Sequence, residues 1–161
     1  MTKSEFQFSD FLAEVDGNYK DFVNNIHAMF LTENYKVKIE SKASGFFVSY
    51  SHPATKRSVL NFLFRKVGLI VRVYADNHND YTALFSEIPE IMIRQMDKAT
   101  PCKRLLNTQS CNPNCLGGYD FYIGENHYQK CRNSCFYFEV NSETLPFLTK
   151  LIESEYKSRC A

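Results

Sequence analysis

The 161-residue sequence has almost no net charge and no long apolar run. Its formal net charge is +1 and its pI is about 7.6, so no overall field attracts nucleic acid or anionic lipid. No segment approaches the roughly 18 apolar residues of a membrane-spanning helix. The first ten residues, MTKSEFQFSD, lack the apolar core of a signal peptide. Tryptophan is also absent, which excludes nothing. We therefore expect a cytoplasmic protein that does not enter the membrane.

The motifs of common catalytic sites are missing too. The sequence contains no Gly-x-Ser-x-Gly, no phosphate-binding P-loop and no Gly-x-Gly-x-x-Gly. It also has no internal repeat and no low-complexity linker. A chain of this length most often forms one domain. We predict a single domain over residues 1–161, with a cysteine-rich subregion at about 100–136.

Aromatic residues are plentiful, and most of them stand in alternating runs that are typical of strands. Apolar residues have helical spacing at 8–15 and 19–31, which predicts helices there. They then alternate with polar residues, and this period of two predicts two hairpins within 35–51 and 59–74. Helical spacing returns from about residue 80 to 96, where Pro89 starts a new helix or kinks this one. Two short strands around a turn at 124–126, a strand at 135–140 and a last helix from 145 follow. This order predicts an α+β fold with a largely antiparallel sheet and helices on one face.

Five of the six cysteines lie close together in the second half of the chain: Cys102, Cys111, Cys115, Cys131 and Cys135. In a reducing cytoplasm such cysteines bind metal or perform redox chemistry more often than they form structural disulfides. A tetrahedral zinc site needs four donors, and each Cys-x3-Cys pair can supply two. The turn residues at 112–114 and the Gly117-Gly118 pair let the backbone curl around an ion. We predict zinc, with an iron–sulfur cluster as the alternative because cysteine-only ligation also suits it.

The spacing leaves open which four cysteines bind. The symmetric set is Cys111, Cys115, Cys131 and Cys135. If the chain is already extended from 131 to 135, those two sulfurs lie roughly 13 Å apart, too far for one ion. Cys102 then replaces Cys135, and we favour this asymmetric set. His127 could replace one sulfur, although a histidine at a hairpin tip is more often a surface residue, and Cys160 is expected to be free.

Charged residues near the cysteines and after the second hairpin are the other candidates for function. Lys103, Arg104, Lys130 and Arg132 could join one positive face that binds protein or, non-specifically, nucleic acid. Cations also commonly accompany thiolate-rich zinc sites, so these four have a structural interpretation as well. The loop with Asp76 and His78 could present acid–base groups, or it could be an ordinary capped loop.

One region resembles a group of bacterial proteins. The run TKRSVLNFLFRKVGLIVRVYADN, the IPE segment and the later C-CNPNC-GYDFYI-YQKCR segment are similar to small proteins found chiefly in Firmicutes, over residues 55 to 135. The order of hairpin then helix is more distantly similar to domains associated with double-wing (YjbR-like) DNA-binding proteins. The resemblance implies a bacterial cytosolic protein and assigns no catalytic residue.

Two hypotheses of function follow. The first is a zinc-stabilised binding or regulatory module that contacts protein or nucleic acid through the positive face. The alternative is a metal- or thiol-dependent enzyme that uses the cysteine centre or the Asp76 and His78 loop. Self-association through the aromatic sheet is compatible with both.

Overall fold

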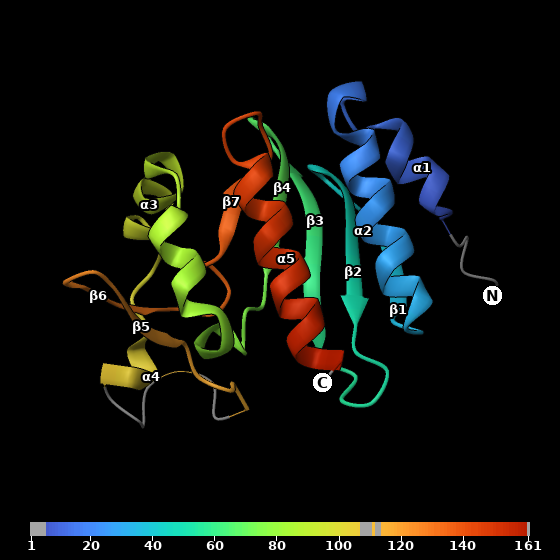
Figure 1. The fold of residues 1–161 in the computed structure, drawn as a ribbon. Coiled ribbons are helices and arrows are strands. Elements are labelled where there is room, and N and C mark those ends of the chain that lie inside the picture. Colours follow the sequence, from blue (N-terminus) through green and yellow to red (C-terminus); the bar gives the residue numbers. More distant parts are fainter. Residues whose placement is uncertain (1–5, 107–110, 112–113, 161) are drawn as a thin grey trace. The chain divides into compact units, whose positions relative to one another are not determined.

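The computed structural model describes residues 6–106, 111 and 114–160 (Figure 1). Contacts along the chain divide it into two compact units. Unit 1 lies within residues 1–73 and 139–141, and unit 2 lies within residues 74–138 and 142–161. We describe each unit by itself, and the expectation of one folding domain stays a prediction.

Unit 1 is built on the two predicted hairpins, which the structure confirms. Strands β1 (Lys36–Lys42), β2 (Gly45–Ser51), β3 (Ser58–Arg65) and β4 (Gly68–Val73) pair antiparallel in chain order. Among the residues that the structure describes, the strand order is β1-β2-β3-β4-β7, where β7 is Tyr137–Glu139, so β1 is an edge strand of this sheet. The first hairpin turns at Gly45, whose φ is +130°; a side chain there would also meet the Phe64 ring at 2.9 Å.

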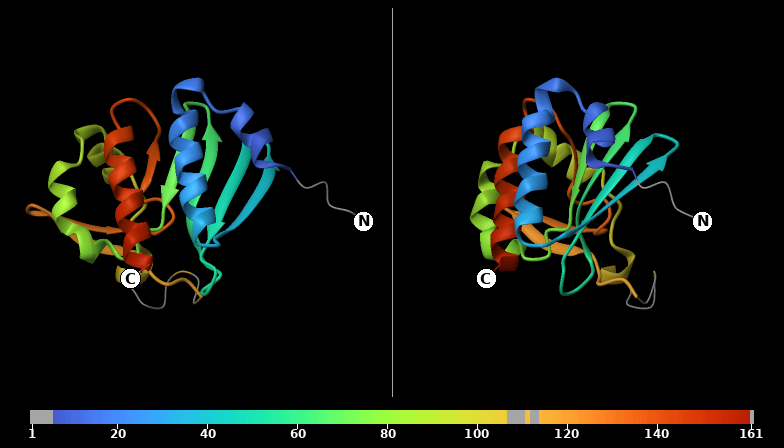
Figure 2. Two further views of the ribbon diagram at one scale, coloured as in Figure 1. Left: turned by 45° about the vertical axis from the view of Figure 1, so that its right-hand side comes forward. Right: turned by 90° about the vertical axis from the view of Figure 1, so that its right-hand side faces the viewer.

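Two helices cover one face of the strands of unit 1. They are α1 (Phe8–Ala13) and α2 (Lys20–Thr32), joined by the short 3-10 helix η1 (Gly17–Tyr19) (Figures 1 and 2). Phe11 lies 5.6 Å from Phe62 between ring centroids, and Phe30 lies 5.0 Å from Tyr50. Each such buried aromatic side chain stabilises the fold by about 1.5–3 kcal/mol relative to exposure. The apolar face of α2 is therefore confirmed, except that Leu31 is 46% exposed.

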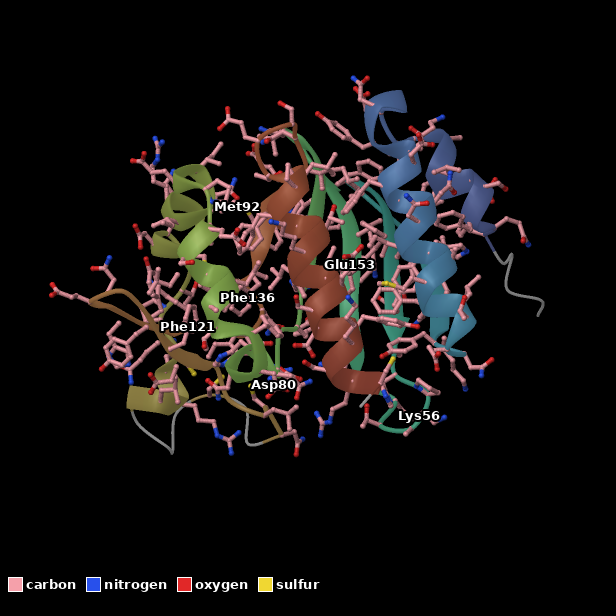
Figure 3. The ribbon with its side chains drawn as sticks, in the orientation of Figure 1. Lys56, Asp80, Met92, Phe121, Phe136 and Glu153 are labelled. Atoms are coloured by element: carbon pink, nitrogen blue, oxygen red, sulfur yellow. The ribbon has the colours of Figure 1, made fainter. Side chains whose placement is uncertain are left out.

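Unit 2 contains the cysteine-rich segment and a second aromatic core. Its elements are η2 (His78–Glu87), α3 (Glu90–Asp97), α4 (Lys103–Leu106), the hairpin β5 (Tyr119–Ile123) and β6 (Asn126–Lys130), and α5 (Leu145–Cys160). Phe121 and Phe136, both labelled in Figure 3, stack at 5.5 Å between centroids. Phe85 stacks on both. Pro89 precedes α3, as expected for a helix start, but residues 78–87 form a 3-10 helix kinked at Tyr81 instead of an α-helix.

The structure is thus α+β with a mostly antiparallel sheet packed by helices, as predicted. In the described parts of the chain, no helix has the length and apolar character needed to cross a membrane. One strand boundary differs from the prediction. Residues 132–136 form turns and β7 begins only at Tyr137, although the expected parity holds, with Phe136, Phe138 and Val140 buried.

Candidate functional site

The five clustered cysteines lie in different environments within unit 2. Cys102 and Cys135 are buried, Cys115 and Cys131 are half-buried, and Cys111 is exposed, as is Cys160 further along the chain; all six thiols are free. Within residues 6–106, 111 and 114–160, no three His, Cys, Asp or Glu side chains are grouped so that they could hold a metal ion. The predicted metal-binding segment is therefore not shown by the structure. Zinc, and the alternative iron–sulfur cluster, stay predictions.

The assumption of an extended chain between Cys131 and Cys135 is wrong. The Cys135 amide donates to the Cys131 carbonyl at 2.9 Å, which closes a turn. The chain between the two cysteines is therefore not extended, and the separation of roughly 13 Å that an extended chain would impose does not apply. Cys135 itself is fully buried, and burial raises the pKa of its thiol above the ordinary value.

Gly117 and Gly118 hold the sulfurs of two cysteines that are distant in the sequence. The Gly117 amide donates to Cys115 Sγ at 3.3 Å, and the Gly118 amide donates to Cys102 Sγ at 3.2 Å. A side chain on Gly118 would clash with the Lys130 carbonyl and meet Cys102 Sγ at 2.7 Å. This glycine is therefore needed because Cys102 and the backbone approach so closely.

Three of the four predicted surface cations bind the chain itself. Lys130 Nζ donates to the carbonyls of Asp97 and Ala99 at 3.1 Å each, at the C-terminal end of α3. Arg104 donates to the Cys115 carbonyl, and Arg132 Nη1 donates to the Gly117 carbonyl at 3.3 Å. Lys103 is exposed. The described contacts of Arg104, Lys130 and Arg132 thus fix the loops around the cysteines.

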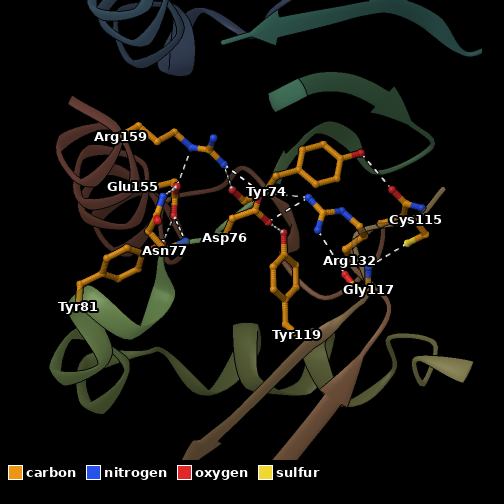
Figure 4. Close-up of polar contacts among 11 residues, drawn as sticks. Tyr74, Asp76, Asn77, Tyr81, Cys115, Gly117, Tyr119, Arg132, Glu155 and Arg159 are labelled. Carbon is orange, nitrogen blue, oxygen red and sulfur yellow. Dashed lines mark hydrogen bonds and ion pairs between the residues drawn. The ribbon is translucent and has the colours of Figure 1, made fainter. Parts of the chain in front are cut away.

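Asp76 lies in a network of ion pairs and hydrogen bonds within unit 2 (Figure 4). Its carboxylate accepts from Tyr119 Oη at 2.9 Å, from Arg132 Nη2 at 2.9 and 3.2 Å, and from Arg159 Nη2 at 3.2 Å. Burial, and then the charge of Asp76, raise the pKa of Tyr119, so its hydroxyl stays a donor. Asp76 therefore joins β5, α5 and the cysteine segment.

The second carboxylate of this network is Glu155 on α5, which is 1% exposed. It accepts from the Asn77 amide at 2.9 Å, from Asn77 Nδ2 at 2.8 Å, from Tyr81 Oη at 2.7 Å and from Arg159 Nε at 2.6 Å. Four donors thus satisfy a carboxylate that is buried away from water. Sequence reasoning missed Glu155, because a single glutamate near the end of an amphipathic helix carries no local signal.

The acid–base hypothesis for Asp76 and His78 stays a prediction, and the structure gives the surroundings of the two side chains. No hydrogen bond joins these two described side chains, and His78 Nδ1 has no hydrogen-bond partner in the described structure. The His78 ring is buried edge-on against Tyr119 at 5.7 Å, and burial lowers its pKa, although Asp76 and Asp120 oppose that shift. His127, which could replace one sulfur of the predicted metal site, contacts Asp120 at 2.5 Å and stacks on Tyr122.

Unit 1 contains a groove that sequence reasoning missed, and we call it the β1 groove. It has a volume of about 770 Å³ and runs along the edge strand, between β1 and the α1 and α2 helices. It is lined by Phe6, Gln7, Phe8, His27, Leu31, Val37, Lys38, Ile39, Glu40 and Ser41. The exposure of Leu31 is explained by this position: its side chain forms part of the groove wall instead of the core.

The wall of the β1 groove on the helix side is held rigidly. The His27 ring stacks on Phe8 at 3.6 Å between centroids, and its Nδ1 lies 2.8 Å from Tyr50 Oη. Tyr50 is fully buried, which raises the pKa of its hydroxyl. The hydroxyl therefore stays protonated and is the hydrogen-bond donor to His27 Nδ1. Burial lowers the pKa of His27, which keeps the ring neutral. The groove therefore presents a fixed aromatic and aliphatic wall beside an open strand edge.

Comparison of this chain with protein-family models, with curated proteins and with solved structures finds no match. The resemblance to Firmicutes proteins and to double-wing domains therefore stays a prediction.

Proposed function

We propose that the chain is a protein-binding module whose β1 groove docks an extended segment of another protein as an additional strand. The observation that carries this proposal is the coincidence of an edge strand with an apolar groove in unit 1. An edge strand directs alternate N–H and C=O groups away from its sheet, and these can pair with an added strand. The groove beside it offers apolar surface to alternate side chains of that strand.

The incomplete burial of apolar residues at this edge supports the proposal. Val37 and Ile39 are opposite Tyr50 and Val48 in β2, which are fully buried beneath the helices. Val37 and Ile39 nevertheless remain only half-buried, and Leu31 beside them is exposed. An added strand would bury these side chains and supply hydrophobic stabilisation in addition to backbone hydrogen bonds.

The proposal can be tested with a display library of random nine-residue peptides. We expect enriched peptides in which apolar residues alternate, because successive side chains of a strand point to opposite faces. Leu31→Gln should weaken their binding about tenfold or more, by removing apolar surface from the groove wall. Val67→Gln is the matched control, because Val67 is also an exposed apolar residue of unit 1 and lies in the β3–β4 turn.

Amide exchange locates the bound peptide. Binding should protect backbone amides of β1, since an added strand bonds them directly. The proposal is contradicted if no peptide is enriched, or if the enriched peptides bind both variants equally and leave β1 amides unprotected.

A further inference from the structure

We infer that the strand bound in the β1 groove is acidic, with carboxylates alternating with apolar side chains. This inference rests on the proposed function and adds the chemistry of the partner. It comes from the two faces of β1, which differ in character. Val37, Ile39 and Ser41 share one face of β1, and the four charged residues alternate with them on the other face. The groove follows this edge, so two of the charged residues, Lys38 and Glu40, line it as well.

The charge on that second face is positive and incompletely compensated. β1 carries three lysines and one glutamate: Lys36, Lys38, Glu40 and Lys42. Glu40 is shared by two of the lysines, with Lys38 Nζ at 2.8 Å and Lys42 Nζ at 3.0 Å. The hydrogen bonds from Lys38 and Lys42 lower the pKa of Glu40, so it stays ionised. One carboxylate for three ammonium groups leaves an excess of positive charge along the strand edge.

This charge pattern selects among the strands that could occupy the edge. Side chains directly opposite each other in paired strands interact favourably when their charges are opposite and unfavourably when they are alike. A carboxylate opposite each lysine therefore stabilises the added strand. A second copy of β1 would bring a further excess of lysines to the same face, so the charge disfavours self-pairing.

The size of β1 sets the length of the partner segment. Its seven residues span about 23 Å at roughly 3.3 Å per residue. A matching segment of seven or so residues places three or four side chains over the groove. The others lie opposite the lysines, and the partner is thus an extended acidic stretch with period-two apolar residues.

The inference is tested with three synthetic peptides of eight residues, which alternate valine with glutamate, with glutamine or with lysine. Fluorescence anisotropy measures their affinity for the full chain at about 20 mM and about 0.5 M salt, where screening is weak and strong respectively. We expect the glutamate peptide to bind about tenfold more tightly than the glutamine peptide at low salt, with the lysine peptide weakest. The advantage should shrink at high salt because these charges are exposed.

Matched variants assign the effect to β1. Combined Lys36→Gln, Lys38→Gln and Lys42→Gln substitutions should remove the preference for glutamate. Combined Lys66→Gln, Lys98→Gln and Lys157→Gln substitutions remove three exposed lysines that lie outside the groove and should preserve it.

The outcomes separate this inference from the proposed function. Equal affinity for the glutamate and glutamine peptides overturns the acidic partner while strand docking stands. If library peptides bind but none of the three synthetic peptides does, the inference again fails alone. Sedimentation showing a dimer that Leu31→Gln dissociates would replace the acidic partner with a second copy of this chain. If neither the library nor the synthetic peptides bind, the proposed function fails as well.

Discussion

Gly118 shows how a single missing side chain shapes the cysteine segment. Its amide donates to Cys102 Sγ, and a Cβ added at this position would clash with the Lys130 carbonyl. The Lys130 carbonyl belongs to backbone, which cannot move aside as a flexible side chain would. The two glycines were expected to let the chain curl around an ion, whereas the contacts give Gly118 the separate role of admitting the Cys102 side chain.

We therefore predict that Gly118→Ala destabilises the protein by about 1–3 kcal/mol, the usual cost of overpacking. Thermal or denaturant unfolding measures the change. Gly17→Ala is the matched control, because no atom lies within 4 Å of the position that its Cβ would occupy and the residue is exposed. Equal stability of Gly118→Ala and Gly17→Ala would mean that the segment adapts to the added methyl group.

At the scale of secondary-structure elements, two histidines are built into packed surfaces. His27 on α2 accepts from the buried Tyr50 hydroxyl, and His78 at the start of η2 packs against Tyr119 and Phe121. Burial is the main cause that lowers the pKa of both rings below the ordinary value of 6.5. Protonation of His27 would also place a hydrogen on the nitrogen that accepts from Tyr50.

These shifts predict that stability falls in mild acid. At pH values between the folded-state pKa of each ring and 6.5, the unfolded chain binds protons that the folded chain does not. The stability that these two neutral rings contribute is therefore fully present above about pH 6.5 and decreases below it. His27→Gln and His78→Gln should each reduce the slope of unfolding free energy against pH between about 5 and 7. Each reduction should be smaller than the limit of about 1.4 kcal/mol per pH unit for one proton.

Denaturant unfolding at several pH values provides these slopes, and the double variant tests whether the two contributions add. Unchanged slopes in both single variants would show that other groups govern the acid response. Because the readout is a slope, a variant that is less stable at every pH remains informative.

At the scale of the whole molecule, the six thiols divide by exposure. Cys111 and Cys160 are exposed, whereas Cys102 and Cys135 are buried, and burial raises the pKa of Cys135. Alkylation proceeds through the thiolate, which a buried thiol with a raised pKa rarely forms. We predict that iodoacetamide modifies Cys160 and, in metal-free protein, Cys111 at least about tenfold faster than Cys135.

The same experiment tests the zinc prediction when it is repeated without and with a chelator. Bound zinc should slow the modification of its cysteine ligands until the chelator removes it. Rates that are identical under both conditions for every cysteine between 102 and 135 would contradict a zinc site. Cys160, which was not expected to bind, serves as the internal reference.

Much of the fold could be predicted from local patterns. Both hairpins of unit 1, the break at Gly17, the helix start after Pro89 and the β5–β6 hairpin follow from spacing, turn residues and proline within short segments. The strand predicted from Cys135 begins late, because the Cys135 amide bonds the Cys131 carbonyl in a turn. The 3-10 helix at 78–87 was also not predicted, and its side chains contribute to the aromatic core and to the Glu155 network.

The sequence by itself determined those helices and strands that depend on neighbours along the chain. It also determined the alternation that gives β1 one apolar and one charged face. Only the tertiary structure decided that β1 is an edge strand, that Leu31 lines a groove, and that Arg104, Lys130 and Arg132 bind loops of their own chain. The physical reason is the distance along the sequence over which each interaction acts. Periodicity and turn chemistry act within a few residues, whereas strand order, burial and the partner of a charge depend on segments far apart in the sequence.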